Sequence, residues 1–556
     1  MIAVLLAVVL MQPLAPAAVK LQPTEADAVA WAFSALASYP DTVRPTIRFV
    51  WLPPWATLEW HGALDFAINA SASQARTLHR GTPHAGGFLL AYDLARLASG
   101  RQLARLIELW DGLAIRDPYF HVSSVNVEQI DCSRCGGDGK LSVSSGRSSS
   151  CPDCNGTGKI TSQGKQVAIL APHLESALAV NAADPQRSER IDVLVTQLTR
   201  STGAIYRADW LIEQLLTSDV GLYPEFRQID FDDGLDKHLA KRGFSRQAAI
   251  DVGGEKGCFL ERSGVTGKQR IVLAFHGPGS RTPAIQTFDL ADANVKPQDQ
   301  FIRNLVNFES KSDASEVFVP LPNGLIEYLL TDGEGVFQRT APDVIVSDST
   351  KPDGFTSRLE MGMSCVICHH VDQGYKTAKN DLDYLFGSDI DFAGEDISTL
   401  RRGEQIVLAR QEIVDLVVSR YAEGLLGGDN ILARARRDYE TAIARITDYQ
   451  ITAEGQTPVQ RVGEQIRQIY HGYRYAQIDA TRTLLELGVA IDGGDPLAVL
   501  SQLVPPPPAG TEEDVQIGLH RAGLRLNRSS LEAIYSDLAA RAALTRPALT
   551  ESESKP

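Results

Sequence analysis

The sequence predicts an α+β fold that is predominantly helical, and three observations support this prediction. Apolar residues recur at helical spacing near the N-terminus and again after about residue 400. Between residues 221 and 350 the pattern changes to short apolar runs separated by Gly, Pro and Asp. Two groups of closely spaced cysteines lie outside these patterns. We therefore expect helical regions at both ends, a β-rich middle and two small cysteine-bearing segments.

The N-terminal residues have the pattern of a secretory signal peptide. An apolar run precedes Ala15 and Ala17, which fit the small-residue cleavage pattern, although no Lys or Arg comes before the run. A buried N-terminal helix is the alternative interpretation. No later run approaches the ~20 consecutive apolar residues of a membrane helix. We expect an exported, periplasmic protein with no transmembrane helix in the mature chain.

Charge and composition narrow the choice of partners. The 556 residues carry 69 acidic and 54 basic side chains, a formal charge of −15, and 44% of them are hydrophobic. This hydrophobic fraction is ordinary for packed domains. Because no dense block of Lys and Arg is present, nucleic acid is excluded as a partner. A redox partner protein is compatible with this composition.

The expected secondary structure follows the periodicity along the chain. Helices are predicted for TEADAVAWAFSALASY, for LLAYDLARLASGRQLARLIELWDGLA and for residues 165–220. Strands are predicted for the runs RIVLAF, AIQTFDL, EVFVPL, LIEYLL and DVIVSD. Long amphipathic helices are predicted for EQIVLARQEIVDLVVSRYAEGLL and VQRVGEQIRQIYHGYRYAQIDATRTLLEL, and VPPPPAG is expected to be a linker.

Four cysteines form the first group, in IDCSRCGGDGKLSVSSGRSSSCPDCNGTGKI. The pairs Cys132–Cys135 and Cys151–Cys154 match the spacing of a four-thiolate zinc site. Each C-x-x-C-x-G-x-G unit resembles the zinc-binding repeat of DnaJ-type chaperones, a family in which four such repeats bind two zinc ions. Two repeats suffice for one structural zinc with no open coordination position. Two local disulfides are the alternative.

The second group is the sequence SCVICHH. Cys365, Cys368 and His369 form C-x-x-C-H, the attachment signature of c-type haem. Residues i, i+3 and i+4 share one face of a helix, so two thiols and an imidazole can meet one porphyrin. Half of a zinc site and a thioredoxin-like dithiol are the alternatives. The odd cysteine, Cys258, is interpreted as a small apolar residue, and His370 as a surface or supporting residue.

Longer segments carry a family resemblance. PLPNGLIEYLLTDGEG, APDVIVSDS and SCVICHH together resemble an exported, planctomycete-type family of cytochrome-c-like proteins whose reaction is not characterised. The segments IELWDGLAIRDPYFHV and YRADWLIEQLL also resemble this family, so that the zinc-knuckle pair is an insertion between them. The resemblance implies covalent haem on Cys365 and Cys368 and iron ligation by His369.

The other axial ligand of the iron is restricted by the methionine content. No methionine follows Met363, and both Met361 and Met363 lie too close to Cys365 to reach the far haem face. The iron is therefore expected to be bis-histidine or open on that side. The candidate distal histidines are His276, His471 and His520.

These observations lead to one function and two alternatives. The expected function is electron transfer or redox sensing by an exported c-type haem protein with a structural zinc site. A peroxidase-like oxidoreductase with an open iron position, or a zinc-knuckle binding protein without haem, are the alternatives. No hydrolase or nucleotide-binding motif is present. The expected regions are a signal peptide (1–17), a helical region (18–125), the zinc-knuckle insertion (126–162), a helical continuation (163–220), a β-rich region (221–350), the haem c segment (351–398), a helical C-terminal region (399–544) and a disordered tail (545–556).

Overall fold

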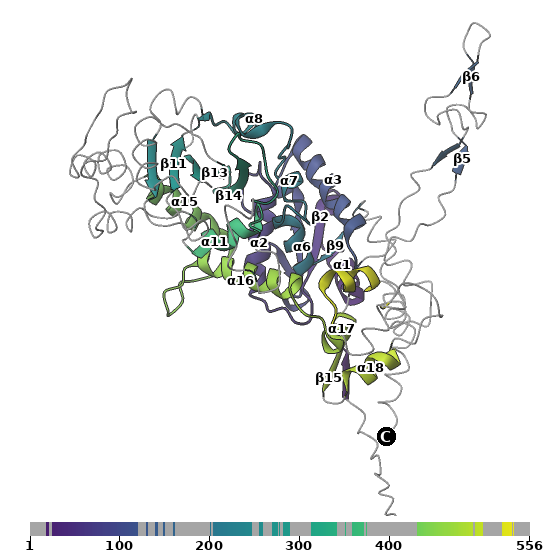
Figure 1. The fold of residues 1–556 in the computed structure, drawn as a ribbon. Coiled ribbons are helices and arrows are strands. Elements are labelled where there is room, and N and C mark those ends of the chain that lie inside the picture. The colour runs from purple at the N-terminus through teal and green to yellow at the C-terminus, as the bar shows by residue number, and fades with distance from the viewer. Residues whose placement is uncertain are drawn as a thin grey trace, which may run out of the picture. The chain divides into compact units, whose positions relative to one another are not determined.

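The structure is a computed structural model, and the chain divides in it into two compact units. Unit 1 comprises residues 1–54, 110–206 and 477–556, and unit 2 comprises residues 55–109 and 207–476. The residues that the structure describes are 18–21, 25–119, 129–131, 140–142, 148–150, 159–161, 199, 201, 204–246, 255–259, 270–275, 277, 282–289, 313–341, 351, 358–371, 374, 431–492, 495–503, 525–535 and 538. Both helices and strands occur, so the fold is mixed α/β (Figure 1). None of the helices in these ranges is long and apolar enough to cross a membrane.

Unit 1 joins segments from both ends of the chain. Strand β1 pairs antiparallel with β15, with Ala18 opposite Asp492. Its interior contains a cluster in which buried Arg528 donates to both carboxylate oxygens of Glu486, at 2.8 and 2.7 Å. The elements of this unit are β1 (Ala18–Leu21), α1 (Glu25–Leu36), the 3-10 helix η1 (Arg44–Thr46), β2 (Ile47–Trp51), α17 (Ala480–Glu486), β15 (Val489–Asp492) and α18 (Pro496–Leu503).

Four short strands flank the first cysteine group, also in unit 1. Strand β5 (Gln129–Asp131) pairs antiparallel with β8 (Lys159–Thr161), and β6 (Lys140–Ser142) pairs antiparallel with β7 (Ser148–Ser150). The two ladders are nested, as in one long hairpin. The segments between them, residues 132–139 and 151–158, lie outside the described residues.

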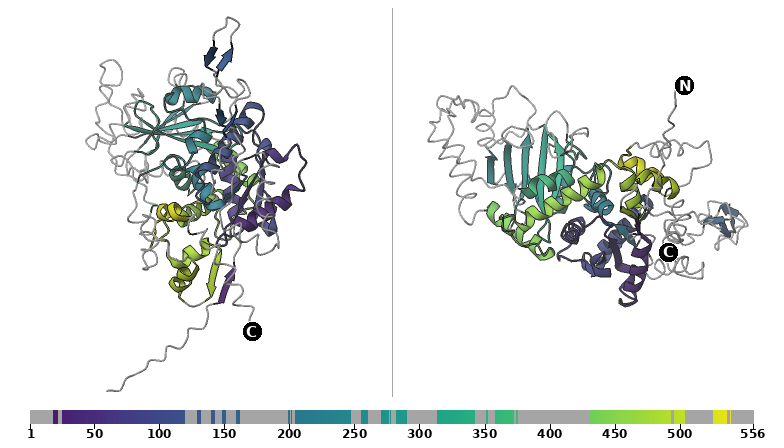
Figure 2. Two further views of the ribbon diagram at one scale, coloured as in Figure 1. Left: turned by 90° about the vertical axis from the view of Figure 1, so that its right-hand side faces the viewer. Right: turned by 90° about the horizontal axis from the view of Figure 1, so that it is seen from below.

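Unit 2 contains an antiparallel sheet of five strands that follow one another in the chain. Its order is β10-β11-β12-β13-β14, and β12, β13 and β14 are buried almost throughout. Helices α15 and α16 lie along one side of this sheet (Figure 2). The strands are β10 (Glu255–Phe259), β11 (Arg270–Phe275), β12 (Ala284–Asp289), β13 (Ala314–Pro320) and β14 (Ile326–Asp332).

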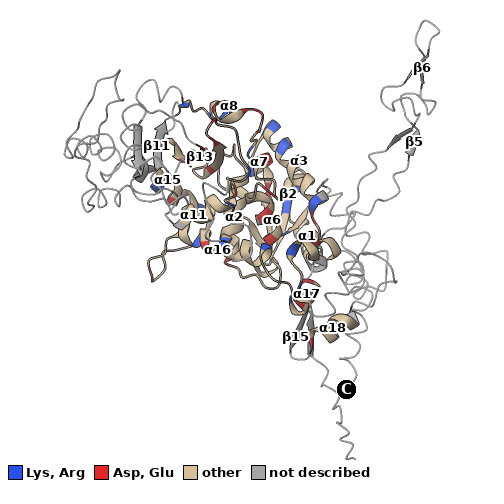
Figure 3. Cartoon of the chain, in the orientation of Figure 1, with Lys and Arg blue, Asp and Glu red and all other residues tan. Residues whose placement is uncertain are grey.

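The remaining elements of unit 2 are mostly helices. They are α2 (Trp60–Ser71), β3 (Thr82–His84), η2 (Ala85–Gly87), β4 (Leu89–Asp93), η3 (Leu94–Arg96), α6 (Ala208–Leu216), α7 (Tyr223–Phe226), α8 (Gly234–Lys241), α11 (Met363–Val371), α15 (Ile431–Ile446) and α16 (Pro458–Arg474). Helix α3 (Gly100–Arg116) and strand β9 (Ile205–Arg207) cross the division between the units in sequence. Acidic and basic side chains are mixed on α3 and α8 (Figure 3).

Most strand predictions are confirmed. RIVLAF, AIQTFDL, EVFVPL and LIEYLL correspond to β11 to β14, whereas DVIVSD lies outside the described residues. Strand β10 was not predicted. The structure also leaves undescribed the signal peptide, the linker VPPPPAG, residues 165–198 and the segment EQIVLARQEIVDLVVSRYAEGLL.

One helix prediction is wrong. Residues Leu89–Asp93, the first part of LLAYDLARL, form β4, which pairs with β3 across a tight turn. In this turn Gly86 and Gly87 have φ values of 66° and 94°, which favour glycine. A short apolar run does not by itself distinguish helix from strand, and here the turn and the pairing determine the outcome.

Candidate functional site

The C-x-x-C-H motif lies on a regular helix of unit 2, α11 (Met363–Val371). The helix follows a sharp turn at Gly362, whose φ is 91°. A Cβ at this position would lie 2.4 Å from the Leu216 carbonyl oxygen, so a larger residue would be both strained and obstructed. Met361 and Met363 are both buried. The turn thus sets the start of the helix and the direction of the motif.

One side of α11, the sheet side, carries Cys365 and His369 and faces β13 and β14. Cys365 is only 1% exposed, and burial together with the nearby Glu316 carboxylate raises the pKa of its thiol well above the usual range. Nε2 of His369 lies 3.2 Å from Oε1 of Glu316. The imidazole is 20% exposed and stacks on Tyr328, with ring centroids 5.7 Å apart. It also packs in a T-shaped arrangement with Phe318, with ring centroids 4.6 Å apart.

Glu316 was not identified from the sequence as a site residue. It lies on β13, in ASEVFVP, and its side chain is 7% exposed. A carboxylate inside an otherwise apolar strand is the signal that could have singled it out, because charged side chains are rarely buried without a partner. Its partner on α11 is 53 residues away in sequence and therefore not visible from local spacing.

The opposite side of α11, the helix side, carries His370 and faces α2, α15 and α16. His370 is fully buried, and its Nε2 shares a hydrogen bond of 2.5 Å with the Tyr439 hydroxyl. Phe66 packs edge-on against the ring, with centroids 5.0 Å apart. Burial lowers the pKa of His370 to about 3. Of the two positions expected for His370, the surface position is therefore wrong, and the structure gives it a supporting position in the interior.

A glycine on α16 allows the two helices to approach closely. A Cβ added to Gly463 would lie 2.3 Å from the Cβ of His370, which is a steric clash. The backbone of α16 thus packs directly against the His370 side chain. This contact fixes the distance between α11 and α16.

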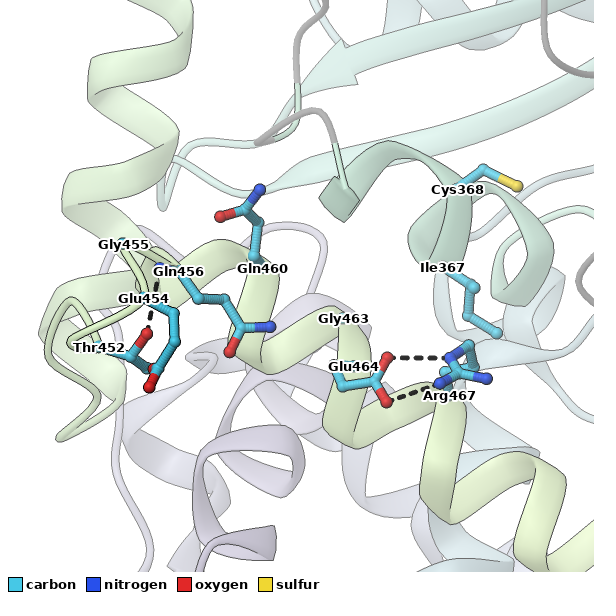
Figure 4. A pocket seen from close by; sticks show the side chains of 10 residues that line it. All are labelled: Ile367, Cys368, Thr452, Glu454, Gly455, Gln456, Gln460, Gly463, Glu464 and Arg467. Atoms are coloured by element: carbon cyan, nitrogen blue, oxygen red, sulfur yellow. Dashed lines mark hydrogen bonds and ion pairs between the residues drawn. The ribbon is translucent and has the colours of Figure 1, made fainter.

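A cavity of about 950 Å³ lies between α11, the start of α16 and the loop that precedes it. In Figure 4, Ile367 points toward Arg467, and the Glu464–Arg467 ion pair borders this end of the cavity. The Cys368 sulfur points away from the loop residues. Only Cys368 belongs to both the motif and the cavity lining. The lining residues are Ile367, Cys368, Thr452, Glu454, Gly455, Gln456, Gln460, Gly463, Glu464 and Arg467.

The other predicted ligands are only partly described. His276 and His520, together with the four cysteines Cys132, Cys135, Cys151 and Cys154, lie outside the described residues. His471 lies on α16, among the rings of Tyr470 and Tyr475. Because α16 packs against the helix side of α11, the structure does not bring His471 to the side on which His369 lies. Cys258 lies on β10. Within the described ranges, no group of three His, Cys, Asp or Glu residues could hold a metal ion.

Two further buried carboxylates lie in unit 2, away from the motif. Glu327 on β14 accepts hydrogen bonds from Arg242 at 2.8 and 3.1 Å and lies 3.2 Å from His238. Burial alone would raise its pKa, but these two side chains outweigh it and hold the pKa well below its usual range. Asp65 on α2 accepts from the Gly81 amide and the Tyr92 hydroxyl, each at 2.8 Å. Burial raises the pKa of Asp65 to about 7.

The residues on α11 have the types and the spacing of a haem c attachment motif, but Cys365 is only 1% exposed, and of the three motif residues only Cys368 borders the cavity. Cys365 lies one turn before Cys368 and His369 on the same helix, and neither cysteine forms a disulfide. One contact differs from what iron ligation needs, because Nε2 of His369 faces a carboxylate. No family model, curated protein or solved structure matches this chain.

Proposed function

We propose that this chain is an exported c-type haem protein that transfers electrons or senses redox state. Cys365 and Cys368 would hold the porphyrin through thioether bonds, and His369 would bind the iron. The observation that supports this proposal is the register of the three residues on α11, with i, i+3 and i+4 on adjacent turns of one regular helix. Bound haem would supply one-electron chemistry at a potential set by its ligands and surroundings.

The chain's own residues would orient and shield the iron ligand. Phe318 and Tyr328 hold the imidazole between two rings, which restricts its rotation. On the other side of the helix, His370 and Tyr439 anchor α11 in the interior.

The proposal is tested by measuring covalent haem in the full chain after expression with a haem c maturation system. We expect the variant Cys365→Ala/Cys368→Ala to lose all haem that survives denaturation, and Cys258→Ala, a matched control outside the motif, to retain it. Haem that survives denaturation in the double variant would refute the assignment. A carbon monoxide adduct formed readily by the reduced protein would favour the peroxidase-like alternative, in which one iron position is open.

We further propose one structural zinc ion on Cys132, Cys135, Cys151 and Cys154. The two flanking ladders support this proposal, because they leave segments of equal length, 132–139 and 151–158, on the two arms of the hairpin. One C-x-x-C pair starts directly after β5 and the other directly after β7. A four-thiolate site needs two such C-x-x-C pairs, and the nested ladders are compatible with this requirement.

Metal analysis tests the zinc proposal. We expect one zinc per chain in the wild type and a clear loss in Cys132→Ser, with the haem spectrum unchanged. Cys258→Ser is the control and should retain the zinc. Full zinc content in Cys132→Ser, or a disulfide between its remaining cysteines in the wild type, would contradict the proposal.

A further inference from the structure

We propose that Cys365 and Cys368 form an exchangeable thiol–disulfide pair, in which Cys368 is the sulfur that meets a disulfide substrate. The inference goes beyond the proposed function and does not depend on it, because it concerns the chain in which both thiols are free. Three observations carry it, namely the spacing of the two cysteines, their place at the start of α11 and their unequal burial.

The spacing brings the two cysteines within bridging distance. Residues i and i+3 of an α-helix have Cα atoms about 5 Å apart, which is within the range that a disulfide spans. Their Cβ atoms are about 5–6 Å apart, whereas a disulfide needs about 4 Å, so a bridge would strain the helix. Strained disulfides are the readily reduced ones. A bridge between Cys365 and Cys368 would therefore be exchangeable and not permanent.

The strain would fall on the first turn of α11. The helix begins at Met363, and the Val366 amide donates to the Gly362 carbonyl at 2.8 Å. The Cys365 amide comes before this bond and belongs to the first turn, whose amides have no partner inside the helix. Movement of Cys365 toward Cys368 therefore disturbs fewer helical hydrogen bonds than the same movement in the middle of a helix would.

Burial distinguishes the two sulfurs. Cys365 is 1% exposed, and its Sγ lies 3.9 Å from the Glu360 carbonyl oxygen. Cys368 is half-buried and borders the cavity of about 950 Å³. A disulfide from solution can therefore approach Cys368 but not Cys365. This order of access makes Cys368 the residue that exchanges first and Cys365 the residue that completes the bridge.

The cavity lining indicates the class of disulfide. It includes Gln456, Gln460 and the Glu464–Arg467 ion pair, which together present hydrogen-bond donors and acceptors of both charges. Such groups match the amides, carboxylates and ammonium groups of a short peptide better than an apolar molecule. The expected substrate is therefore the disulfide of a peptide thiol.

The exchange takes place in two reversible steps. The Cys368 sulfur attacks one sulfur of the substrate, the substrate S–S bond breaks, and one thiol leaves with the proton of Cys368. The Cys365 sulfur then attacks the Cys368 sulfur of this mixed disulfide, and the second thiol leaves with the proton of Cys365. Two electrons pass from the pair to the substrate, which is the oxidant.

Oxidised glutathione added to the full chain, expressed without a haem c maturation system, tests the inference by peptide mass spectrometry. In the wild type we expect a Cys365–Cys368 bridge and no lasting glutathione adduct on either residue. In Cys365→Ala, glutathione should remain on Cys368. In Cys368→Ala, modification of Cys365 should be slower by about tenfold or more, because the thiol is buried. Cys258→Ala is the control and should form the bridge as the wild type does.

Three results would overturn the inference. They are a lasting adduct on Cys368 of the wild type, an adduct on Cys365 that forms as fast as that on Cys368, and the absence of both bridge and adduct. The wild type decides the matter if a variant does not fold, since the bridge is measured there directly. Failure of the proposed function is recognised separately, by the absence of covalent haem after expression with the maturation system.

Discussion

The two sides of α11 place adjacent histidines in opposite situations. On the sheet side, His369 is partly exposed and faces the carboxylate of Glu316, while on the helix side His370 is fully buried against Tyr439 and Phe66. The two residues are chemically identical and differ only by one helical step. The comparison shows that the sheet side leaves a histidine partly exposed beside a carboxylate, whereas the helix side buries a histidine in packing that anchors the motif.

If this division is correct, changes on the helix side should alter stability without altering haem ligation. The predictions below measure free energies of unfolding, and under the proposed function the haem spectrum of each helix-side variant should equal that of the wild type. A spectral change caused by a helix-side variant would break the comparison.

The largest expected effect is the pH dependence that Asp65 gives to the stability of α2. Its pKa is raised from 3.8 to about 7 in the folded chain, so its contribution to stability is full below about pH 4 and is lost as pH rises through about 7. A shift of about three units corresponds to roughly 4 kcal/mol. Asp65→Asn keeps the acceptor for the Gly81 amide and the Tyr92 hydroxyl but does not titrate, so its stability relative to the wild type should rise across this window.

Chemical denaturation at pH 5 and pH 8 measures this difference. Asp65 faces Arg80, Tyr92, Asp448 and Tyr449, whose charges and hydroxyl groups influence its titration. Intermediate pH values between about 4 and 8 are therefore measured as well. Phe66 follows Asp65 and packs on His370. Under the proposed function, the haem spectrum would therefore report whether titration of Asp65 on α2 changes the surroundings of α11. A difference between variant and wild type that does not change with pH would contradict the assignment.

The next effect is expected at the contact between α11 and α16. Gly463→Ala places a Cβ 2.3 Å from the Cβ of His370 and should cost about 3 kcal/mol, since neither backbone can move easily. Gly472→Ala in the same helix meets nothing within 4 Å and should be neutral or stabilising by up to about 1 kcal/mol. Similar unfolding free energies for the two variants would show that the close approach is not needed.

A smaller effect is expected from the hydrogen bond between His370 and Tyr439. Tyr439→Phe keeps the ring but leaves Nε2 of a buried imidazole without its hydroxyl partner, at a cost of about 1–2 kcal/mol. Tyr470→Phe, which removes a hydroxyl 3.3 Å from that of Tyr475, is the control and should cost less. Urea denaturation of the two variants measures these costs. An unchanged midpoint for Tyr439→Phe would count against the anchoring role of His370.

The smallest effect is expected at the N-terminus of α16. Thr457 and Gln460 form a reciprocal capping box, in which each side chain accepts from the other's backbone amide. Thr457→Ala should cost about 1 kcal/mol, while Thr457→Ser should retain most of the stability. A loss above about 2 kcal/mol for Thr457→Ala would indicate that the cap also supports the neighbouring cavity.

The sequence alone determined the features that depend on neighbours in the chain. The four described strand runs, the helices around α1 and α16, and the placement of the C-x-x-C-H motif on one helix all follow from local periodicity and spacing, because backbone hydrogen bonding repeats over a few residues. The zinc and haem assignments also rest on the local spacing of cysteines and histidine, and they remain predictions. The misassigned strand β4 shows the limit of this approach, since a short apolar run takes its structure from its pairing partner.

Only the tertiary structure decided which residues surround the motif. Glu316 lies 53 residues from His369, and Tyr439 lies 69 residues from His370, so neither contact leaves a trace in local spacing. Gly463 matters because another helix passes against it, not because of its own conformation. The physical reason is that packing and buried electrostatics depend on distances in space, which chain topology sets and local sequence does not.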